Sequence, residues 1–346
     1  MDLSEQPVEV QLEILLENHY RFQFLVTACQ VGLFAALEKE PGLPVRDVAA
    51  RVGLQEQPTR ILMLGCTAIG LLRKDGESYF NTPLTKAVSG NFDGTPAAFI
   101  TRENRRIYRA LMWFPEAVKE NTNVGLQREV EGASPTLYGR ITENSELEAE
   151  FHAQMSFTSF LVRDEIRQKI DLSEHKHLLD VGGGTAVNAE NLASRWPDLR
   201  ITIADLPSVA ATANERIQKL GLADRIQAVG IDALNDEFPT GCDALLFAHF
   251  LEIWSPDHIR TLLSKAFRAL PQGGEIFVIT PYQNDDETGP VRAAYLSAYF
   301  LAFASGEGMV YTGKEYETWL AEAGFEPTER VPLGADTILI RARKTS

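Results

Sequence analysis

Residues 176–193, KHLLDVGGGTAVNAENLA, join a short apolar run, three consecutive glycines and a segment that can begin a helix. The apolar pair Leu178 and Leu179 leads into Asp180, and alanine and leucine recur at helical spacing beyond the glycines. This order predicts a strand, a glycine turn and a helix. Glycine suits such a turn because a backbone without Cβ can adopt positive φ and approach a ligand closely. The N–H groups of the following helix would then face that ligand.

A second strand and an acidic residue follow at the spacing of nucleoside-binding folds. Residues 199–203 favour a strand and lead to Asp205, about twenty residues beyond the glycines, where doubly wound folds place an acid on a ribose hydroxyl. The glycine stretch reads GGGTA at 182–186 and is followed by valine, so the G-x-G-x-x-G pattern of dinucleotide enzymes is absent. We therefore expect a nucleoside without a pyrophosphate.

Composition and charge exclude several classes of protein. The chain has 346 residues, 45% apolar and 23% charged, which is ordinary for a soluble protein of two domains. Its acidic start and the lack of a long apolar window predict a cytoplasmic protein without membrane contact. The net charge of −15 disfavours nucleic acid, which binds through basic side chains. The cysteines lie far apart without metal-ligand spacing, so no metal is expected: Cys29, Cys66 and Cys242.

The first hundred residues predict the outline of a winged helix. They suggest a long helix with a break, two short helices and a hairpin, in this order: 7–38 broken near Val31-Gly32, 44–52, 58–72 and 73–82. A helix that reads DNA carries basic and polar residues, whereas the helix at 58–72 is apolar nearly all round. We therefore expect residues 1–100 to form a dimerisation domain buried against other protein.

The rest of the chain predicts a parallel, doubly wound α/β sheet at its carboxyl end. A helix at 146–170 carries apolar residues, among them Phe151 and Met155, and leads directly into the glycine strand. Helices and strands then alternate, and acidic residues follow the strands. The carboxyl ends of parallel strands are where such sheets bind ligands. Two runs at 329–331 and 337–342 are expected to add an antiparallel pair.

With these features the chain resembles the S-adenosylmethionine-dependent small-molecule methyltransferases of the plant caffeate O-methyltransferase type and their bacterial antibiotic-pathway relatives. The resemblance spans nearly the whole chain through six motifs in order: HYRFQFLVTACQVGLFAAL with RILMLGCTAIGLL, DVGGGT at 180–185, DLP at 205–207, VGID at 229–232, Leu251-x-x-Trp254 and EAGF at 322–325. It implies a homodimer formed by an N-terminal winged-helix domain at 1–100. A helical linker at 101–170 would cover the active site, and a Rossmann-like catalytic domain would occupy 171–346.

The resemblance also implies how the cofactor binds. Gly182 and Gly184 would face the amino-acid part of S-adenosylmethionine, Asp205 its ribose and Asp232 its adenine amine, while Trp254 would pack on the adenine. Together with their neighbours, the implied cofactor contacts are Asp180, Gly182, Gly184, Asp205, Leu206, Asp232, Ala233, Trp254 and Met155. The product would be S-adenosylhomocysteine. One departure is Ala186, where the family usually has a further glycine.

The catalytic positions depart further from the family. O-methyltransferases of this type have Leu-His-Asp-Trp, with the histidine as base, whereas this chain has Leu-Glu-Ile-Trp at 251–254. We predict Glu252 as the base and keep His249 as the alternative, because alternation along a strand puts these two residues on opposite sides. A carboxylate among apolar neighbours is also partly removed from water, which suits proton transfer near neutral pH. A third interpretation is that base catalysis is dispensable.

The predicted function is methyl transfer to a small aromatic or phenolic specialised metabolite. A phenolate is nucleophilic at its ortho carbon, so one base serves methylation at carbon as well as at oxygen. Because the usual histidine is replaced, we rank methylation at ring carbon equal to methylation at oxygen or nitrogen. An alternative enzyme would keep the cofactor without transferring its methyl group, as a pericyclase or hydroxylase. The expected acceptor contacts are Phe151, Tyr299, Phe300 and Phe303, near Met155 and Glu252.

Overall fold

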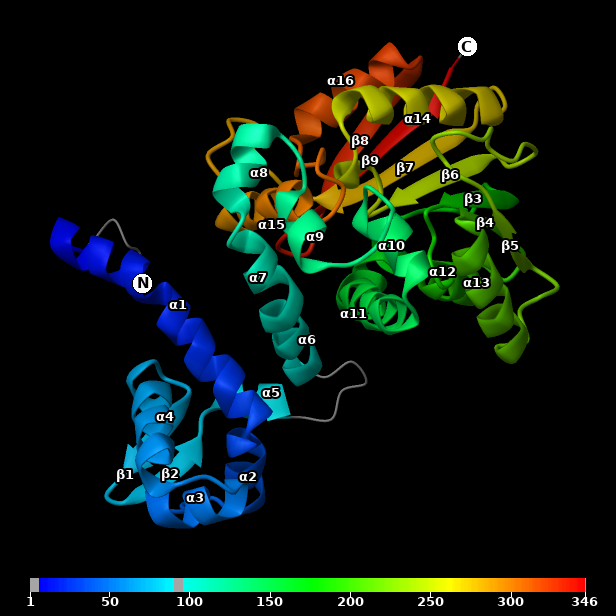
Figure 1. Ribbon diagram of the computed structural model, residues 1–346. Helices are drawn as coiled ribbons and strands as arrows, with labels where there is room; N and C mark the ends of the chain where they lie inside the picture. The colour runs from blue at the N-terminus through cyan, green and yellow to red at the C-terminus, as the bar shows by residue number, and fades with distance from the viewer. Residues whose placement is uncertain (1–5, 90–95, 346) are drawn as a thin grey trace. The chain divides into compact units, whose positions relative to one another are not determined.

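The glycine stretch folds as a strand, a turn and a helix, as predicted. In the computed structural model, which describes residues 6–89 and 96–345, β3 (His177–Val181) ends at the glycines and α12 (Val187–Arg195) follows them (Figure 1). Ala186 precedes the helix with φ 69°, a left-handed conformation that costs a residue with a Cβ roughly 1–2 kcal/mol. Ala186 thus adopts a conformation that glycine would adopt at no steric cost.

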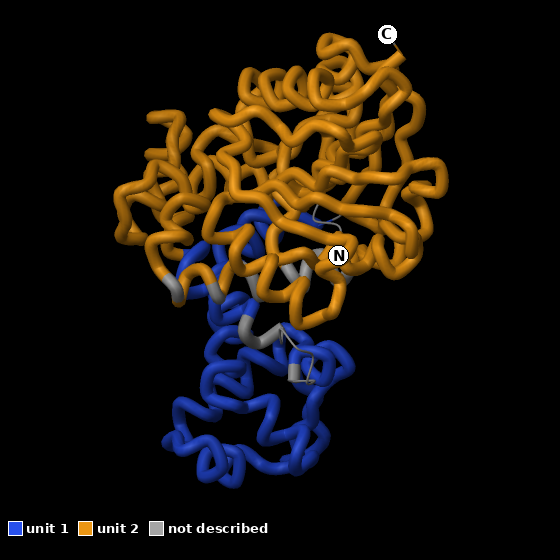
Figure 2. Tube along the Cα trace, turned by 90° about the vertical axis from the view of Figure 1, so that its right-hand side faces the viewer, with its two compact units in different colours: residues 1–108 blue, residues 109–346 orange. Residues whose placement is uncertain are grey.

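Seven strands form one sheet in the second of two compact units, residues 1–108 and 109–346 (Figure 2). Their order is β5-β4-β3-β6-β7-β9-β8; the first five run parallel, and β9 runs antiparallel to β7 and β8. This confirms the Rossmann-like sheet and its antiparallel terminal pair. The other strands are β4 (Arg200–Asp205), β5 (Ile226–Gly230), β6 (Ala244–Ala248), β7 (Glu275–Pro281), β8 (Phe325–Leu333) and β9 (Thr337–Lys344).

Helices cover both faces of this sheet because successive strand residues point to opposite sides. Leu178 packs with the helices of one face, and its neighbour Leu179 packs with those of the other; both are about 1% exposed. The first face carries α12, α13 (Pro207–Lys219) and the end of α11 (Ser145–Lys169). The second carries α14 (Pro256–Ala269) and α16 (Gly313–Glu322) (Figure 1).

Shorter helices complete the second unit, and the first of them begins at Tyr108, the last residue of the first unit. Thr136 precedes α10, and the hydroxyl oxygen of Thr136 caps the helix by accepting the N–H of Gly139. Helix α15 packs against α8 and α9. These helices are α7 (Tyr108–Leu111), α8 (Phe114–Glu120), α9 (Val124–Glu129), α10 (Leu137–Glu143) and α15 (Val291–Ala302).

The first unit has the predicted winged-helix outline. Gly32, with φ 74°, separates α1 from α2 and confirms the predicted break. A helix pair and a hairpin follow around a core that includes Phe34 and Met63. Among the described residues no single helix has the length and hydropathy of a membrane span; α1 and α2 meet those limits only as a pair bent by 56°. The elements are α1 (Val8–Gln30), α2 (Leu33–Lys39), α3 (Val45–Val52), α4 (Glu56–Ala68), β1 (Leu72–Asp75), β2 (Ser78–Asn81), α5 (Pro83–Ser89), α6 (Pro96–Arg102) and a π-helix at Glu103–Ile107.

Large apolar side chains of the first unit remain exposed in the single chain. Helix α4 buries Met63 and Cys66 on one face, whereas Ile61 and Leu64 on the other are 56% and 67% exposed. We expected this helix to be buried on all sides. Within the single chain only one of its faces is buried. Helix α1 exposes a similar row: Leu12, Leu15, Leu16 and Tyr20. Contiguous apolar surface of this kind marks an interaction site.

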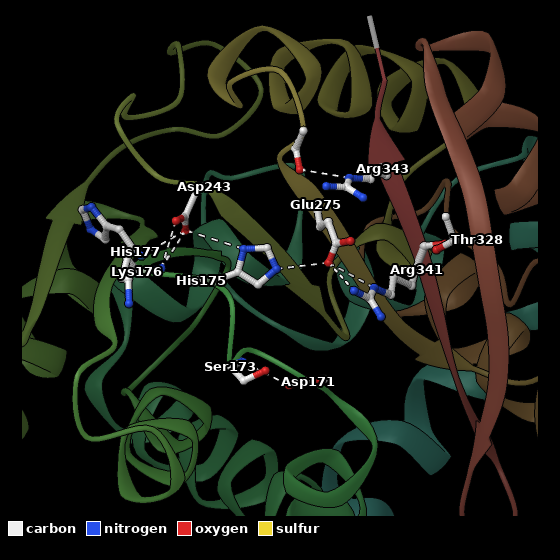
Figure 3. A network of polar contacts seen from close by, with 11 residues as sticks. Asp171, Ser173, His175, Lys176, His177, Asp243, Glu275, Thr328, Arg341 and Arg343 are labelled. Atoms are coloured by element: carbon white, nitrogen blue, oxygen red, sulfur yellow. Dashed lines mark hydrogen bonds and ion pairs between the residues drawn. The ribbon is translucent and has the colours of Figure 1, made fainter.

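Polar contacts join the amino ends of the strands, at the edge opposite the glycines (Figure 3). Nε2 of His175 lies 3.1 Å from Oε2 of Glu275, and Arg341 donates to the same oxygen at 2.6 Å and 3.0 Å. Asp243 accepts the backbone N–H of His177 at 3.0 Å. Because these charges are satisfied within the fold, we assign this edge a structural role and look for the ligand site at the carboxyl edge.

Candidate active site

A cavity of about 390 Å³ lies at the carboxyl edge of the sheet. The turns after β3, β4, β5 and β6 form one side of it, and the segment around α10 with part of α11 forms the other. Its volume is in the range of small-molecule sites. Of the residues predicted from the sequence, its walls contain Phe151, Met155, Gly182, Gly184, Asp205, Leu206, Asp232, Ala233, His249 and Trp254.

The glycine turn brings backbone to the cavity and places a buried carboxylate behind it. Gly182 has φ 73°, and a Cβ there would lie 2.2 Å from the ring of Phe250, so only glycine fits. Asp180 is fully buried against Gly183, and neither of its carboxylate oxygens has a hydrogen-bond partner among the described residues. Burial, with the nearby negative charge of Asp205, raises the pKa of Asp180 from 3.8 to about 7.

Two backbone N–H groups hold Asp205 at the cavity wall. Its Oδ2 accepts the N–H of Gly184 at 2.8 Å, and its Oδ1 accepts the N–H of Leu206 at 2.7 Å. These two bonds fix the direction of the carboxylate, and Asp205 lines the cavity. The arrangement suits the ribose contact predicted for this residue.

The turn after β5 carries Asp232, and Lys265 holds this turn by hydrogen bonds to its carbonyl oxygens. The carboxylate of Asp232 accepts the N–H of Leu234 at 3.0 Å, which shapes the start of the turn. Nζ of Lys265 donates to the carbonyl oxygens of Ala233, Leu234 and Asp236 at 2.9, 2.6 and 2.7 Å. Because Lys265 is only 6% exposed, these carbonyl groups replace most of the water around its ammonium group.

Replacing Lys265 by methionine is expected to weaken S-adenosylmethionine binding about tenfold, because hydrogen bonds from a charged donor hold the wall that carries Asp232. Isothermal titration calorimetry would measure the dissociation constant. Lys219→Met, at the exposed end of α13, is the matched control and should bind as the unchanged protein does. Equal dissociation constants for the two variants would mean that the turn keeps its shape without the ammonium group.

Strand geometry ends where β6 ends, at Ala248. His249 adopts the left-handed conformation, with φ 53°, and residues 251–253 form a 3-10 turn. The expectation that alternation places His249 and Glu252 on opposite sides is therefore wrong. Nδ1 of His249 instead lies 3.4 Å from Oε1 of Glu252.

The two candidate bases hold different positions relative to the cavity. His249 lies on the wall, and its Nε2 has no hydrogen-bond partner among the described residues. Glu252 is 2% exposed and does not line the cavity. Its other oxygen accepts the hydroxyl of Thr280 at 3.5 Å, and that hydroxyl lies 3.2 Å from the hydroxyl of Tyr316. The imidazole thus stands between the cavity and a buried carboxylate.

The predicted acceptor contacts divide between the cavity and the core. Tyr299, Phe300 and Phe303 do not line the cavity; they pack against one another, and Phe303 is 1% exposed. Their role as acceptor contacts stays a prediction. Sequence reasoning missed several wall residues because the polar stretch around α10 has no periodic signal, and its place depends on tertiary packing. They include Ser134, Thr136, Tyr138, Gly139 and Ile141.

S-adenosylmethionine fits the groups at this end of the cavity. It is a cation with an ammonium and a sulfonium group, and behind the glycines that line the cavity the buried carboxylate of Asp180 offers a negative charge that burial otherwise disfavours. Trp254 presents an aromatic wall, makes edge contacts with Phe250 and His258, and has an indole N–H without a partner among the described residues. Asp205 supplies acceptors for hydroxyl groups.

Known proteins share this architecture. The O-methyltransferase domain matches residues 113–326, and the O-methyltransferase dimerisation domain matches residues 14–89. The chain is 38% identical over 326 residues to L-tyrosine C(3)-methyltransferase of Streptomyces lavendulae, covering 94% of this chain and 89% of that protein. It is 31% identical over 312 residues to 3-hydroxy-5-methyl-1-naphthoate 3-O-methyltransferase of Streptomyces sahachiroi, covering 88% and 86%.

Solved structures agree over the whole length. The S-adenosylmethionine-dependent methyltransferase SibL in its apo form superposes with a TM-score of 0.82 at 32% identity, covering 97% of this chain and 99% of SibL. Human N-acetylserotonin methyltransferase in complex with S-adenosylmethionine gives a TM-score of 0.83 at 26% identity, with 100% of both chains covered. The fold, the matched domains and the cofactor-shaped end of the cavity lead to one conclusion: this chain belongs to the S-adenosylmethionine-dependent methyltransferases built on the O-methyltransferase domain.

Proposed function

We propose that the protein transfers a methyl group from S-adenosylmethionine to a ring carbon of a phenolic amino acid of the tyrosine type. The observation that carries the proposal is the pair of His249 and Glu252: His249 lines the cavity, and its Nε2 is buried without a hydrogen-bond partner among the described residues. The substrate class is supported by the L-tyrosine C(3)-methyltransferase of Streptomyces lavendulae, 38% identical over 94% of this chain.

The proposed chemistry assigns the base to His249 and a positioning role to Glu252. When bound, the cofactor supplies an electrophilic methyl group, and the acceptor loses one proton for each methyl group that it gains. Nε2 of His249 takes the phenol proton. The imidazolium that results is stabilised by the buried carboxylate 3.4 Å from Nδ1, as in other base–carboxylate pairs. The phenolate is then nucleophilic at its oxygen and at its ortho carbon. When the methyl group is added at the ortho carbon, that carbon afterwards loses its hydrogen as a proton and the oxygen regains one, so the acceptor loses one proton in all.

Incubation with S-adenosylmethionine and L-tyrosine tests this assignment. We expect S-adenosylhomocysteine and a ring-methylated amino acid in equal amounts, with the position of the methyl group determined by NMR. A methyl group on oxygen would contradict ring methylation and place the protein with relatives such as the naphthoate O-methyltransferase. Conversion of a substrate without release of S-adenosylhomocysteine would favour the alternative in which the enzyme keeps the cofactor but transfers no methyl group.

We also infer a homodimer formed through the first unit, supported by the match to a dimerisation domain over residues 14–89. Light scattering at micromolar concentration should give about twice the chain mass of 38.4 kDa. Leu64→Glu places a charge on the exposed apolar face of α4 and should shift the mass toward one chain. Leu220→Glu, at an exposed leucine of the second unit, is the control. A dimer that withstands Leu64→Glu would exclude this face from the interface.

A further inference from the structure

Tyr138 adds a second polar group to the wall of the cavity. It belongs to α10, lines the cavity and packs edge-on against Phe151, with 5.9 Å between the ring centroids. Its hydroxyl makes no hydrogen bond with any residue in the described part of the chain. A half-buried phenol on a cavity wall, without a partner in the protein, can satisfy its hydroxyl through a ligand.

Burial, more than the neighbouring charges, keeps the hydroxyl of Tyr138 protonated. Burial, and then the negative charges of Tyr299 and Glu252, raise its pKa well above 10. Glu252 in turn contacts His249, so the tyrosine and the histidine share one electrostatic environment. Tyr138 is therefore a neutral hydrogen-bond donor near neutral pH, and Nε2 of His249 has no hydrogen-bond partner among the described residues.

We propose that Tyr138 is a catalytic residue that donates a hydrogen bond to the acceptor's phenol oxygen while His249 receives the proton of that oxygen. The proposal rests on the proposed function in that it takes the acceptor to be a phenol. A donor at this position stabilises the developing negative charge on oxygen. It also occupies a lone pair of that oxygen, which lowers its nucleophilicity and leaves the ortho carbon as the favoured site of methylation.

A binding experiment with 4-nitrophenol tests the inference without methyl transfer, because ionisation of this phenol changes its absorption. Titration from pH 5 to pH 9, with saturating S-adenosylhomocysteine, gives the pKa of the bound phenol. We expect Tyr138→Phe to raise that pKa by about one, since a hydrogen bond to a charged oxygen is worth at least about tenfold. Tyr295→Phe, at an exposed tyrosine of α15, should leave it unchanged.

The outcomes separate this inference from the proposed function. Failure of 4-nitrophenol to bind the unchanged protein, or equal pKa values of the bound phenol with and without the tyrosine hydroxyl, would overturn the role of Tyr138. With L-tyrosine as acceptor, we expect Tyr138→Phe to lower turnover and to raise the share of O-methylated product. A shifted 4-nitrophenol pKa in a protein that methylates no phenolic amino acid would uphold the donor role and reject the proposed substrate.

Discussion

Replacing His249 by glutamine is expected to lower turnover by about 10²–10⁴-fold, the usual contribution of a positioned general base. Glutamine keeps a polar side chain on the cavity wall but accepts no proton, so the S-adenosylmethionine dissociation constant should stay nearly unchanged. Steady-state assays of S-adenosylhomocysteine release would measure the first quantity, and calorimetry the second. His19→Gln, on the exposed part of α1, is the matched control and should retain full turnover.

Glu252→Gln distinguishes the base from the residue that positions it. If Glu252 acts through His249, this variant should lose less turnover than His249→Gln, because the imidazole stays on the cavity wall and loses only the carboxylate 3.4 Å from its Nδ1. The two substitutions combined should cost little more than His249→Gln alone, since both act on one unit. A full loss in Glu252→Gln with near-normal turnover in His249→Gln would reverse the assignment and restore Glu252 as the base.

The fold could be predicted from the sequence because its signals are local. The glycines at 182–184 and Asp205 lie at a spacing that follows from one strand–turn–helix unit and the next strand. The apolar pair Leu178 and Leu179 indicates a strand, and in the structure the two side chains pack on opposite faces of the sheet. These patterns need no knowledge of distant contacts, and the structure confirms the elements that they predict.

The catalytic end of the site could not be predicted in the same way. Alternation predicts side-chain direction only within a strand, and it fails at His249 because that residue adopts positive φ immediately after β6. The approach of Glu252 to His249 depends on the 3-10 turn that follows. Tyr138 reaches the same cavity from α10, through packing between segments more than a hundred residues apart in sequence. Such convergence leaves no periodic signal.

The ionised carboxylate of Asp180 is expected to lower the free energy of unfolding and to favour binding of the cationic cofactor. Its pKa is about 7 in the folded chain and 3.8 without the fold, so between pH 4 and pH 7 the folded chain holds a proton that the unfolded chain has lost. The stability contributed by this group therefore falls as pH rises through that window and stays low above pH 7. The difference between the two values corresponds to about 4 kcal/mol, at 1.36 kcal/mol for each pKa unit.

Asp180→Asn, which resembles the protonated acid in shape, should remove this dependence on pH. The variant's stability advantage over the unchanged protein should grow between pH 4 and pH 7, by up to about 4 kcal/mol, when unfolding by urea is followed without cofactor. Its affinity for S-adenosylmethionine should fall about 10–100-fold at pH 8, because a buried carboxylate no longer faces the cation. Binding to the unchanged protein should release a proton near pH 7, which calorimetry in buffers of different ionisation enthalpy detects.

Asp224→Asn, at an exposed loop, is the control and should change neither quantity. A parallel pH dependence of unfolding in the Asp180 variant and the unchanged protein would show that Asp180 is already ionised in the folded chain. Unchanged cofactor affinity would show that the buried carboxylate does not contribute to binding, and Asp205 would remain as the acidic contact. The combination that we expect, a more stable protein that binds its cofactor less well, follows because the charge that destabilises the empty site is the charge that the cation neutralises.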